Sequence, residues 1–194
     1  MRPYTYAEGR SVLRGMVNNL VLELVKRQVV TDQLGIRIDY DAQRSENAAD
    51  YQGAMTEDYY DRRVPKPAHT TVKLAQATAS QREIGTAYQQ LYQQVVNHHL
   101  LIRRVTVIAN HLVDEQHLSQ QPRYQQTNLF ENPDIAKKRD QIAQQQRERD
   151  QRLQQAILNL QRSSGNKNVV IRLADLKTGA TTIERNEQIG GHRA

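Results

Sequence analysis

Two adjacent large apolar side chains, Leu129 and Phe130, lie in a stretch of the chain that is otherwise polar. Gln126 precedes them, with Thr127 and Asn128 between. The stretch offers no apolar neighbours, whereas an apolar cleft on a partner could bury both side chains while the Gln126 amide forms hydrogen bonds at its rim. The spacing therefore predicts a peptide that binds another protein. The alternative is a local contact of Leu129 and Phe130 with the sheet or the following helix.

A second candidate for chemistry is the pair Asp39 and Asp41, because carboxylates two residues apart on a strand share a face and could hold Mg²⁺ for phosphoryl transfer. No third acidic residue and no phosphate-binding loop accompanies the pair, so an acidic pair at the end of a strand is the favoured interpretation. The six histidines provide no convincing set of metal ligands, and cysteine is absent. The sequence therefore predicts no metal, no cofactor and no catalytic residue.

The net charge of +6 and the pI near 9.6 describe a basic chain. Such a charge is compatible with a polyanionic partner, since lysine and arginine release counterions when they meet phosphates. A solvated basic surface is the alternative. The lack of cysteine fits a reducing compartment, and the sequence contains neither a run of ~20 apolar residues nor the apolar segment of a signal peptide. We expect a cytoplasmic protein that does not span a membrane.

Two helices are predicted from capping boxes that precede apolar residues at helical spacing. Thr5 and Glu8 open the first helix, which ends near Arg27, and Ser80 and Glu83 open the second. Each places its apolar residues on one side. Both helices are therefore expected to cover a core rather than stand alone.

Three strands are predicted from the alternation of apolar and polar side chains. They cover residues 33–40, 69–74 and 101–112, and Arg103 and Arg104 lie at the start of the last one. The order helix, strand, strand, helix, strand favours an α+β fold, in which a small antiparallel-rich sheet carries two helices on one face. The other face is then free for a large partner.

The composition divides the chain into four parts. They are the α+β domain over residues 1–113 with a long loop at 41–67, a linker at 114–133 that holds the peptide, a Gln-rich polar helix at 134–162, and a tail at 163–194. Apolar positions in the polar helix are too sparse to sustain heptads. A solvated helix is therefore favoured over a coiled coil.

Several separated segments, together covering nearly the whole chain, share one order with a known group of proteins. The segments are Arg2–Tyr6, Val30–Leu34, Val64–Lys66, Arg103–His111, Gly179–Asn186 and Ile189–Ala194. They resemble a bacterial group of Y-family DNA polymerases. The peptide Gln126–Phe130 resembles the one with which bacterial DNA polymerases and repair proteins hold the sliding clamp.

The resemblance implies that residues 1–113 are similar to the little finger domain, which in this family lies against DNA beside the polymerase core. A sheet face on which arginine and lysine alternate with apolar residues can follow phosphates without reading bases. Plain surface charge is the alternative at each position. The residues onto which the resemblance carries DNA contact are Arg103 and Arg104 and, more loosely, Arg37, Lys73, Thr71 and Thr106.

The same resemblance implies that the palm, fingers and thumb would precede residue 1, with the nucleotide site and the metal-binding carboxylates. The first strand of the little finger would also precede Arg2, so we expect an incomplete sheet. We expect a fragment of a translesion DNA polymerase, noncatalytic alone, that binds DNA, damaged DNA included, without sequence preference and associates with the sliding clamp. One alternative is an interaction protein that occupies the clamp and competes with other polymerases. Another is the DNA-holding subunit of a split lesion-bypass polymerase whose core is a separate chain.

Overall fold

The computed structural model describes residues 2–44, 51–116, 133–171, 182–189 and 192–193. The elements are α1 (Tyr6–Lys26), β1 (Val29–Arg44), β2 (Met55–Glu57), β3 (Arg63–Pro65), β4 (Ala68–Thr78), α2 (Gln81–Val95), β5 (Leu100–Asp114), α4 (Pro133–Ser164), α5 (Thr182–Asn186), β6 (Gln188–Ile189) and β7 (His192–Arg193).

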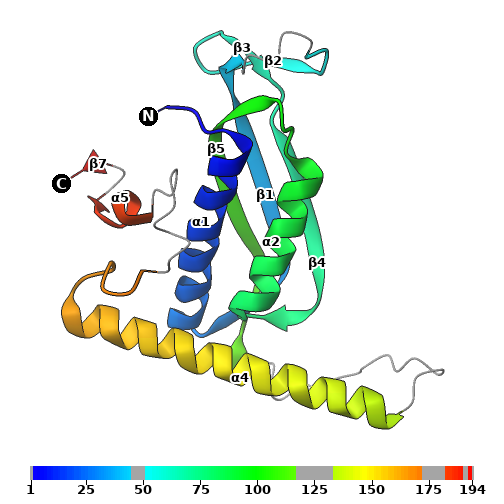
Figure 1. The fold of residues 1–194 in the computed structure, drawn as a ribbon, viewed down its shortest axis with the longest axis vertical. Coiled ribbons are helices and arrows are strands. Elements are labelled where there is room, and N and C mark those ends of the chain that lie inside the picture. The colour runs from blue at the N-terminus through cyan, green and yellow to red at the C-terminus, as the bar shows by residue number, and fades with distance from the viewer. Residues whose placement is uncertain (1, 45–50, 117–132, 172–181, 190–191, 194) are drawn as a thin grey trace.

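The three longest strands form one antiparallel sheet in the order β4-β1-β5. Leu34, Ile36 and Ile38 of β1 are buried under the helices, whereas Arg37 between them is exposed on the other face. Helices α1 and α2 lie side by side over one face of this sheet (Figure 1). The predicted α+β fold, with a small antiparallel sheet and two helices on one face, is confirmed.

Helix α1 begins with the predicted capping box. The Thr5 hydroxyl accepts a hydrogen bond from the N–H of Glu8 at 3.4 Å, and the Glu8 carboxylate accepts one from the N–H of Thr5 at 3.0 Å. Arg2 donates to the same carboxylate at 2.5 Å. This hydrogen bond from Arg2 is the largest cause of the lowered pKa of Glu8. The first turn of α1 is therefore held by a charged contact as well as by its cap.

Two buried tyrosines of α2 form hydrogen bonds to the backbone of α1 and of β5. The Tyr92 hydroxyl donates to the carbonyl of Tyr6 at 2.7 Å, and the Tyr88 hydroxyl donates to the carbonyl of Ile108 at 2.8 Å and accepts from its N–H at 3.1 Å. Burial raises the pKa of both hydroxyls, so they stay protonated. At Gly9 the α1 backbone passes so close that a Cβ would lie 2.6 Å from the Tyr92 hydroxyl. Gly9 thus permits the close packing of α1 on α2.

Helix α2 begins after Ser80 as predicted, but only half of the predicted capping box forms. The Ser80 hydroxyl accepts from the N–H of Glu83 at 3.4 Å. The Glu83 carboxylate instead accepts from Arg147 of α4 at 2.7 Å, and the Ser80 hydroxyl donates to Asp150 of α4 at 2.9 Å. The second half of the box is replaced because α4 engages the glutamate.

Helix α4 crosses the lower ends of α1 and α2 in Figure 1. Gln154 and Ile157 of α4 are buried, whereas Leu153 and Leu160 are exposed. A helix over 134–162 is confirmed, and most of its described side chains are exposed, as expected of a solvated helix. A few of its polar side chains nevertheless pair with the start of α2. Although α4 has 32 residues, neither it nor any other helix in the described part of the chain is long and apolar enough to cross a bilayer.

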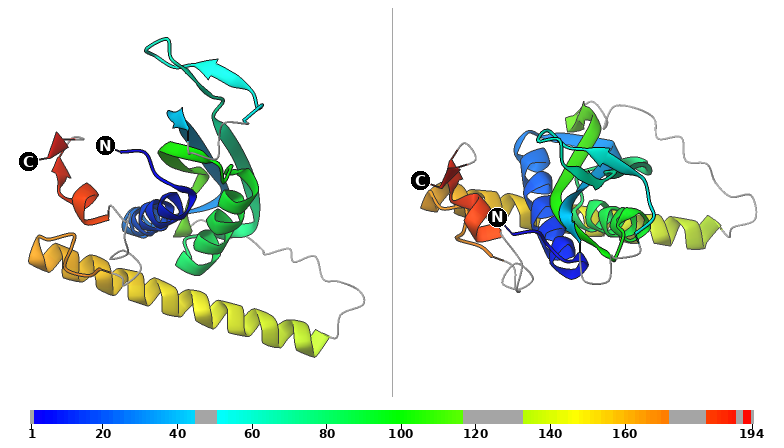
Figure 2. Two further views of the ribbon diagram at one scale, coloured as in Figure 1. Left: turned by 45° about the horizontal axis from the view of Figure 1, so that its top comes forward. Right: turned by 90° about the horizontal axis from the view of Figure 1, so that it is seen from above.

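The segment 41–67 contains more secondary structure than predicted. β1 continues to Arg44, and β2 pairs with β3 as a hairpin. The prediction of one long loop is wrong because strands of three residues are too short to show an alternating pattern. The hairpin extends beyond the end of the sheet at which β5 begins (Figures 1 and 2).

The segment before α1 touches the open edge of β5. Tyr4 and Ile102 form an isolated antiparallel bridge, in which each N–H donates to the other carbonyl at 2.8 Å.

Candidate nucleic-acid interface

The sheet face opposite the helices carries most of the predicted site residues. Residues opposite each other in antiparallel strands point to the same face, with Cβ atoms ~5 Å apart. The register therefore brings predicted residues from three strands together on one surface. Its cross-strand rows are Lys73–Gln33–Asn110, Thr71–Gly35–Ile108, His69–Arg37–Thr106 and Asp39–Arg104.

A β-bulge adds Arg103 to this face. Asp39 lies opposite Arg104 and Tyr40 lies opposite Ile102, so Arg103 has no register partner on β1. Regular alternation would turn one of two adjacent arginines toward the core, but the extra residue of a bulge changes the direction of the side chains that follow. Ile102 is buried, and both arginines are exposed. We name the surface formed by the four rows and Arg103 the free sheet face.

Two aspartates lie among these cations. The Asp39 carboxylate lies 2.9 Å from the Arg37 guanidinium, and the Asp41 carboxylate lies 3.5 Å from that of Arg103. The acidic pair considered for Mg²⁺ thus contacts arginines. Among the residues that the structure describes, no group of three or more histidines and carboxylates is placed to hold a metal ion.

Lys73 and Arg104 are the cations of the free sheet face that form no ion pair with another described residue. They lie in the first and last of the four rows. Gly35 occupies the centre of the second row, so the middle strand has no raised side chain there. Exposed cations at both ends of a sheet surface, with no side chain protruding at Gly35 of the middle strand, suit the extended and regular negative charge of a nucleic acid backbone.

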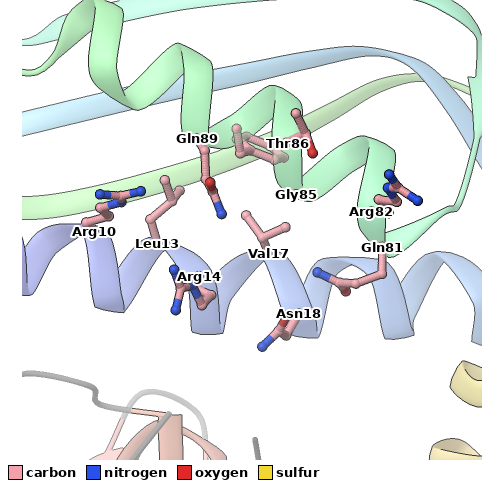
Figure 3. Close-up of a pocket in the computed structure, with 11 residues that line it drawn as sticks. Arg10, Leu13, Arg14, Val17, Asn18, Gln81, Arg82, Gly85, Thr86 and Gln89 are labelled. Carbon is pink, nitrogen blue, oxygen red and sulfur yellow. The ribbon is translucent and has the colours of Figure 1, made fainter. Parts of the chain in front are cut away.

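A second basic surface is a groove of about 250 Å³ between α1 and α2, which we name the helix groove (Figure 3). Arg10 and Arg14 of α1 and Arg82 of α2 line it together with the apolar side chain of Leu13. Arg82 donates to Gln146 of α4 at 2.6 Å. Because the two helices separate this groove from the free sheet face, its arginines cannot contact the same stretch of duplex.

The predicted protein-binding peptide, with Gln126, Leu129 and Phe130, lies outside the described residues. The description stops at Gln116 and resumes at Pro133. Association of this peptide with a partner therefore stays a prediction.

The fold defines the class of protein. Two helices on one face of a small antiparallel sheet, with the other face free, are the arrangement expected of a little finger domain. Residues 2–123 match the model of the impB/mucB/samB family C-terminal domain. The chain belongs to this family, and its matched part is the C-terminal, little finger region of Y-family DNA polymerases. None of the curated proteins compared matches the chain.

The sequence did not lead us to predict two features at the end of the sheet where β5 begins. One is the bulge, which the order Ile102, two arginines and an apolar residue could have indicated, because it breaks the alternation of a strand. The other is the pairing of β2 with β3, which forms the hairpin that exposes Tyr59 and Tyr60 at its tip. Adjacent tyrosines inside a polar turn were its signal.

Proposed function

We propose that the free sheet face binds DNA through its phosphates, without sequence preference and including damaged DNA, as the DNA-holding part of a translesion polymerase. The observation that supports this most is the bulge, because it exposes Arg103 and Arg104 together beside the row that holds Arg37 and Thr106. Lys73 and Thr71 continue the same surface on β4.

Phosphate groups would replace the internal partners of two arginines. Arg37 and Arg103 contact aspartates in the isolated domain, and exposed ion pairs of this kind contribute only ~0–1 kcal/mol each. Opening them for a phosphate therefore costs little. The hydroxyls of Thr71 and Thr106 can donate to phosphate oxygens, which orients DNA without reading bases.

We also propose that the peptide Gln126–Phe130 associates with the sliding clamp. A clamp-bound peptide and a DNA-bound face in one chain raise each other's effective concentration, so two weak contacts act as one stronger contact. In this proposal the domain holds DNA and supplies no catalysis, because Asp39 and Asp41 serve as partners of arginines.

The DNA proposal is tested with Arg103→Gln combined with Arg104→Gln. Duplex affinity is measured by fluorescence anisotropy at several salt concentrations, and the slope of log K against log [salt] is compared with that of the wild type. Each phosphate contact contributes about 0.9 to this slope on B-DNA, so the variant should flatten it by about 1.8.

The matched control is Arg10→Gln with Arg14→Gln in the helix groove, which removes the same charge from the same residue type. This control should keep the wild-type slope. Equal slopes for the wild type and the Arg103/Arg104 variant would overturn the DNA proposal.

Clamp association is tested with Leu129→Ala combined with Phe130→Ala, in a pull-down with purified clamp. We expect binding to be lost, since both side chains would fill the apolar cleft. Leu153→Ala with Leu160→Ala removes two exposed apolar side chains of α4 and should leave binding intact. Undiminished capture of the Leu129/Phe130 variant would reject the peptide as the contact.

A further inference from the structure

The tip of the β2–β3 hairpin presents two aromatic rings to solvent. Tyr59 is 93% exposed and Tyr60 is 72% exposed. The rings meet edge to face, with centroids 5.3 Å apart. Neither ring contributes to the core of the domain. An adjacent pair of exposed rings is therefore not explained by the stability of the fold.

The turn that carries these rings is held in one conformation. The Asp58 carboxylate accepts hydrogen bonds from the N–H of Tyr60 at 2.9 Å and from the N–H of Arg62 at 3.0 Å. The Arg62 side chain donates to the same carboxylate at 2.6 Å, and its guanidinium carbon lies 5.4 Å from the centre of the Tyr60 ring. Asp61 adopts φ of +56° to close the turn. The rings are thus presented in a preorganised arrangement, which lowers the entropic cost of binding.

The charge of Asp41 acts on both the tip and the free sheet face. Arg62 has a raised pKa, first because of its hydrogen bond to Asp58 and in smaller part because of the charge of Asp41. Asp41 is the carboxylate that contacts Arg103 of the bulge. Arg63 on β3 is exposed as well. In the left view of Figure 2 the hairpin projects beyond the sheet.

We propose that the hairpin tip stacks on unpaired bases of a single strand that continues from duplex held on the free sheet face. Aromatic rings bind bases of any sequence through their faces, and nearby arginines attract the backbone that connects them. Exposed tyrosines beside arginines also suit protein contacts. Arg62 and the exposed Arg63 beside the rings favour nucleic acid, and the proposal rests on the proposed function of the free sheet face.

The test uses the absence of tryptophan from the chain. Tyr59→Trp and, separately, Tyr60→Trp each place one fluorophore at the tip. Each variant is titrated with blunt duplex, with the same duplex carrying a single-stranded extension, and with oligothymidylate. Stacking should quench the emission with the extended duplex and with oligothymidylate, and blunt duplex should leave it unchanged.

A second measurement keeps the result independent of the probe. Tyr59→Ala with Tyr60→Ala should weaken binding to the extended duplex about ten-fold or more and leave blunt-duplex affinity and the salt slope unchanged, because no cation is removed. Tyr59→Phe with Tyr60→Phe keeps the rings and should bind almost as the wild type. Emission that stays constant at saturation, together with unchanged affinity of the alanine variant, would overturn the stacking proposal and leave a protein partner for the tip.

The two proposals fail in different ways. Loss of the DNA role of the free sheet face would appear as an unchanged salt slope in the Arg103/Arg104 variant. Loss of the stacking role would appear as unchanged tryptophan emission in a protein whose salt slope still depends on Arg103 and Arg104.

Discussion

The free sheet face and the helix groove are both basic, yet their cations are arranged in different ways. On the free sheet face, three strands set Lys73, Arg37 and Arg104 in the first, third and fourth rows, with neighbouring strands at the regular spacing of a sheet. In the helix groove, Arg10 and Arg14 lie on adjacent turns of one helix, beside an apolar wall. The first arrangement is extended and open, and the second is narrow.

The comparison teaches that net charge alone does not distinguish between two basic surfaces. Both surfaces contribute to the net charge of +6. Only the free sheet face offers an open surface that a phosphate backbone can follow, because its helix-free side leaves room for a rod-shaped partner. The predictions below test this distinction from the largest expected effect to the smallest.

The largest effect is expected from charge reversal across the strands. Arg37→Glu with Lys73→Glu replaces attraction with repulsion at two rows and should weaken duplex binding about a thousand-fold at low salt. Lys137→Glu with Lys138→Glu makes the same charge change on the exposed start of α4 and should have much less effect. Anisotropy titrations measure both. Equal losses in the two variants would show that overall charge, rather than the free sheet face, determines binding.

The next effect concerns stability on the helix side. Gly9→Ala places a Cβ 2.6 Å from the Tyr92 hydroxyl and should lower the free energy of unfolding by about 1–3 kcal/mol. Gly85→Ala, in a wall of the helix groove, meets nothing nearer than 3.5 Å and should be tolerated or stabilising. Urea unfolding compares the two. Similar stability of both variants would contradict the close packing at Gly9.

A smaller effect is expected from the aspartates of the free sheet face. Asp39→Asn with Asp41→Asn removes the internal partners of Arg37 and Arg103 and should strengthen duplex binding about ten-fold. Glu148→Gln with Glu187→Gln removes the same charge elsewhere on the exposed surface and should raise affinity less. If the two double variants gain equally in anisotropy titrations, the aspartates do not compete with phosphate.

The smallest effect is the acid dependence of the first turn of α1. The pKa of Glu8 lies below its ordinary value of 4.5, so its contribution to stability is complete above that pH and is lost as the pH falls through the lowered value. The wild type should therefore lose more stability between pH 5 and pH 3 than Glu8→Gln, by up to about 1 kcal/mol. Thermal unfolding across this range measures the difference, and parallel curves would show that the contact with Arg2 is too weak to matter.

The elements with strong periodic patterns could be predicted from the sequence, and the irregular ones could not. The capping residues Thr5 and Ser80 placed both helices, since a helix start depends on local chemistry. The side chain of Glu83 was misassigned because Arg147, 64 residues away, competes for it. A local pattern contains no information about such a distant partner.

The candidate site likewise combines regular features that the sequence predicts with irregular features that it does not. Alternation along β1 and β4 was sufficient to place Arg37 and Lys73 on one face. The bulge at Arg103 depends on register between two strands, and the short hairpin around Tyr59 and Tyr60 lacks the length that periodicity requires. Both features depend on how two chain segments pair with each other, and this pairing cannot be read from the residue types of one segment.

The hydroxyl of Tyr88 also occupies part of the outer edge of the sheet. Exposed strand edges recruit strands from other chains and lead to aggregation. β5 is an edge strand, and the backbone N–H and carbonyl of Ile108 are both engaged by Tyr88, while those of Ile102 are engaged by Tyr4. A neighbouring copy that paired with Ile102 or Ile108 would have to displace Tyr4 or Tyr88.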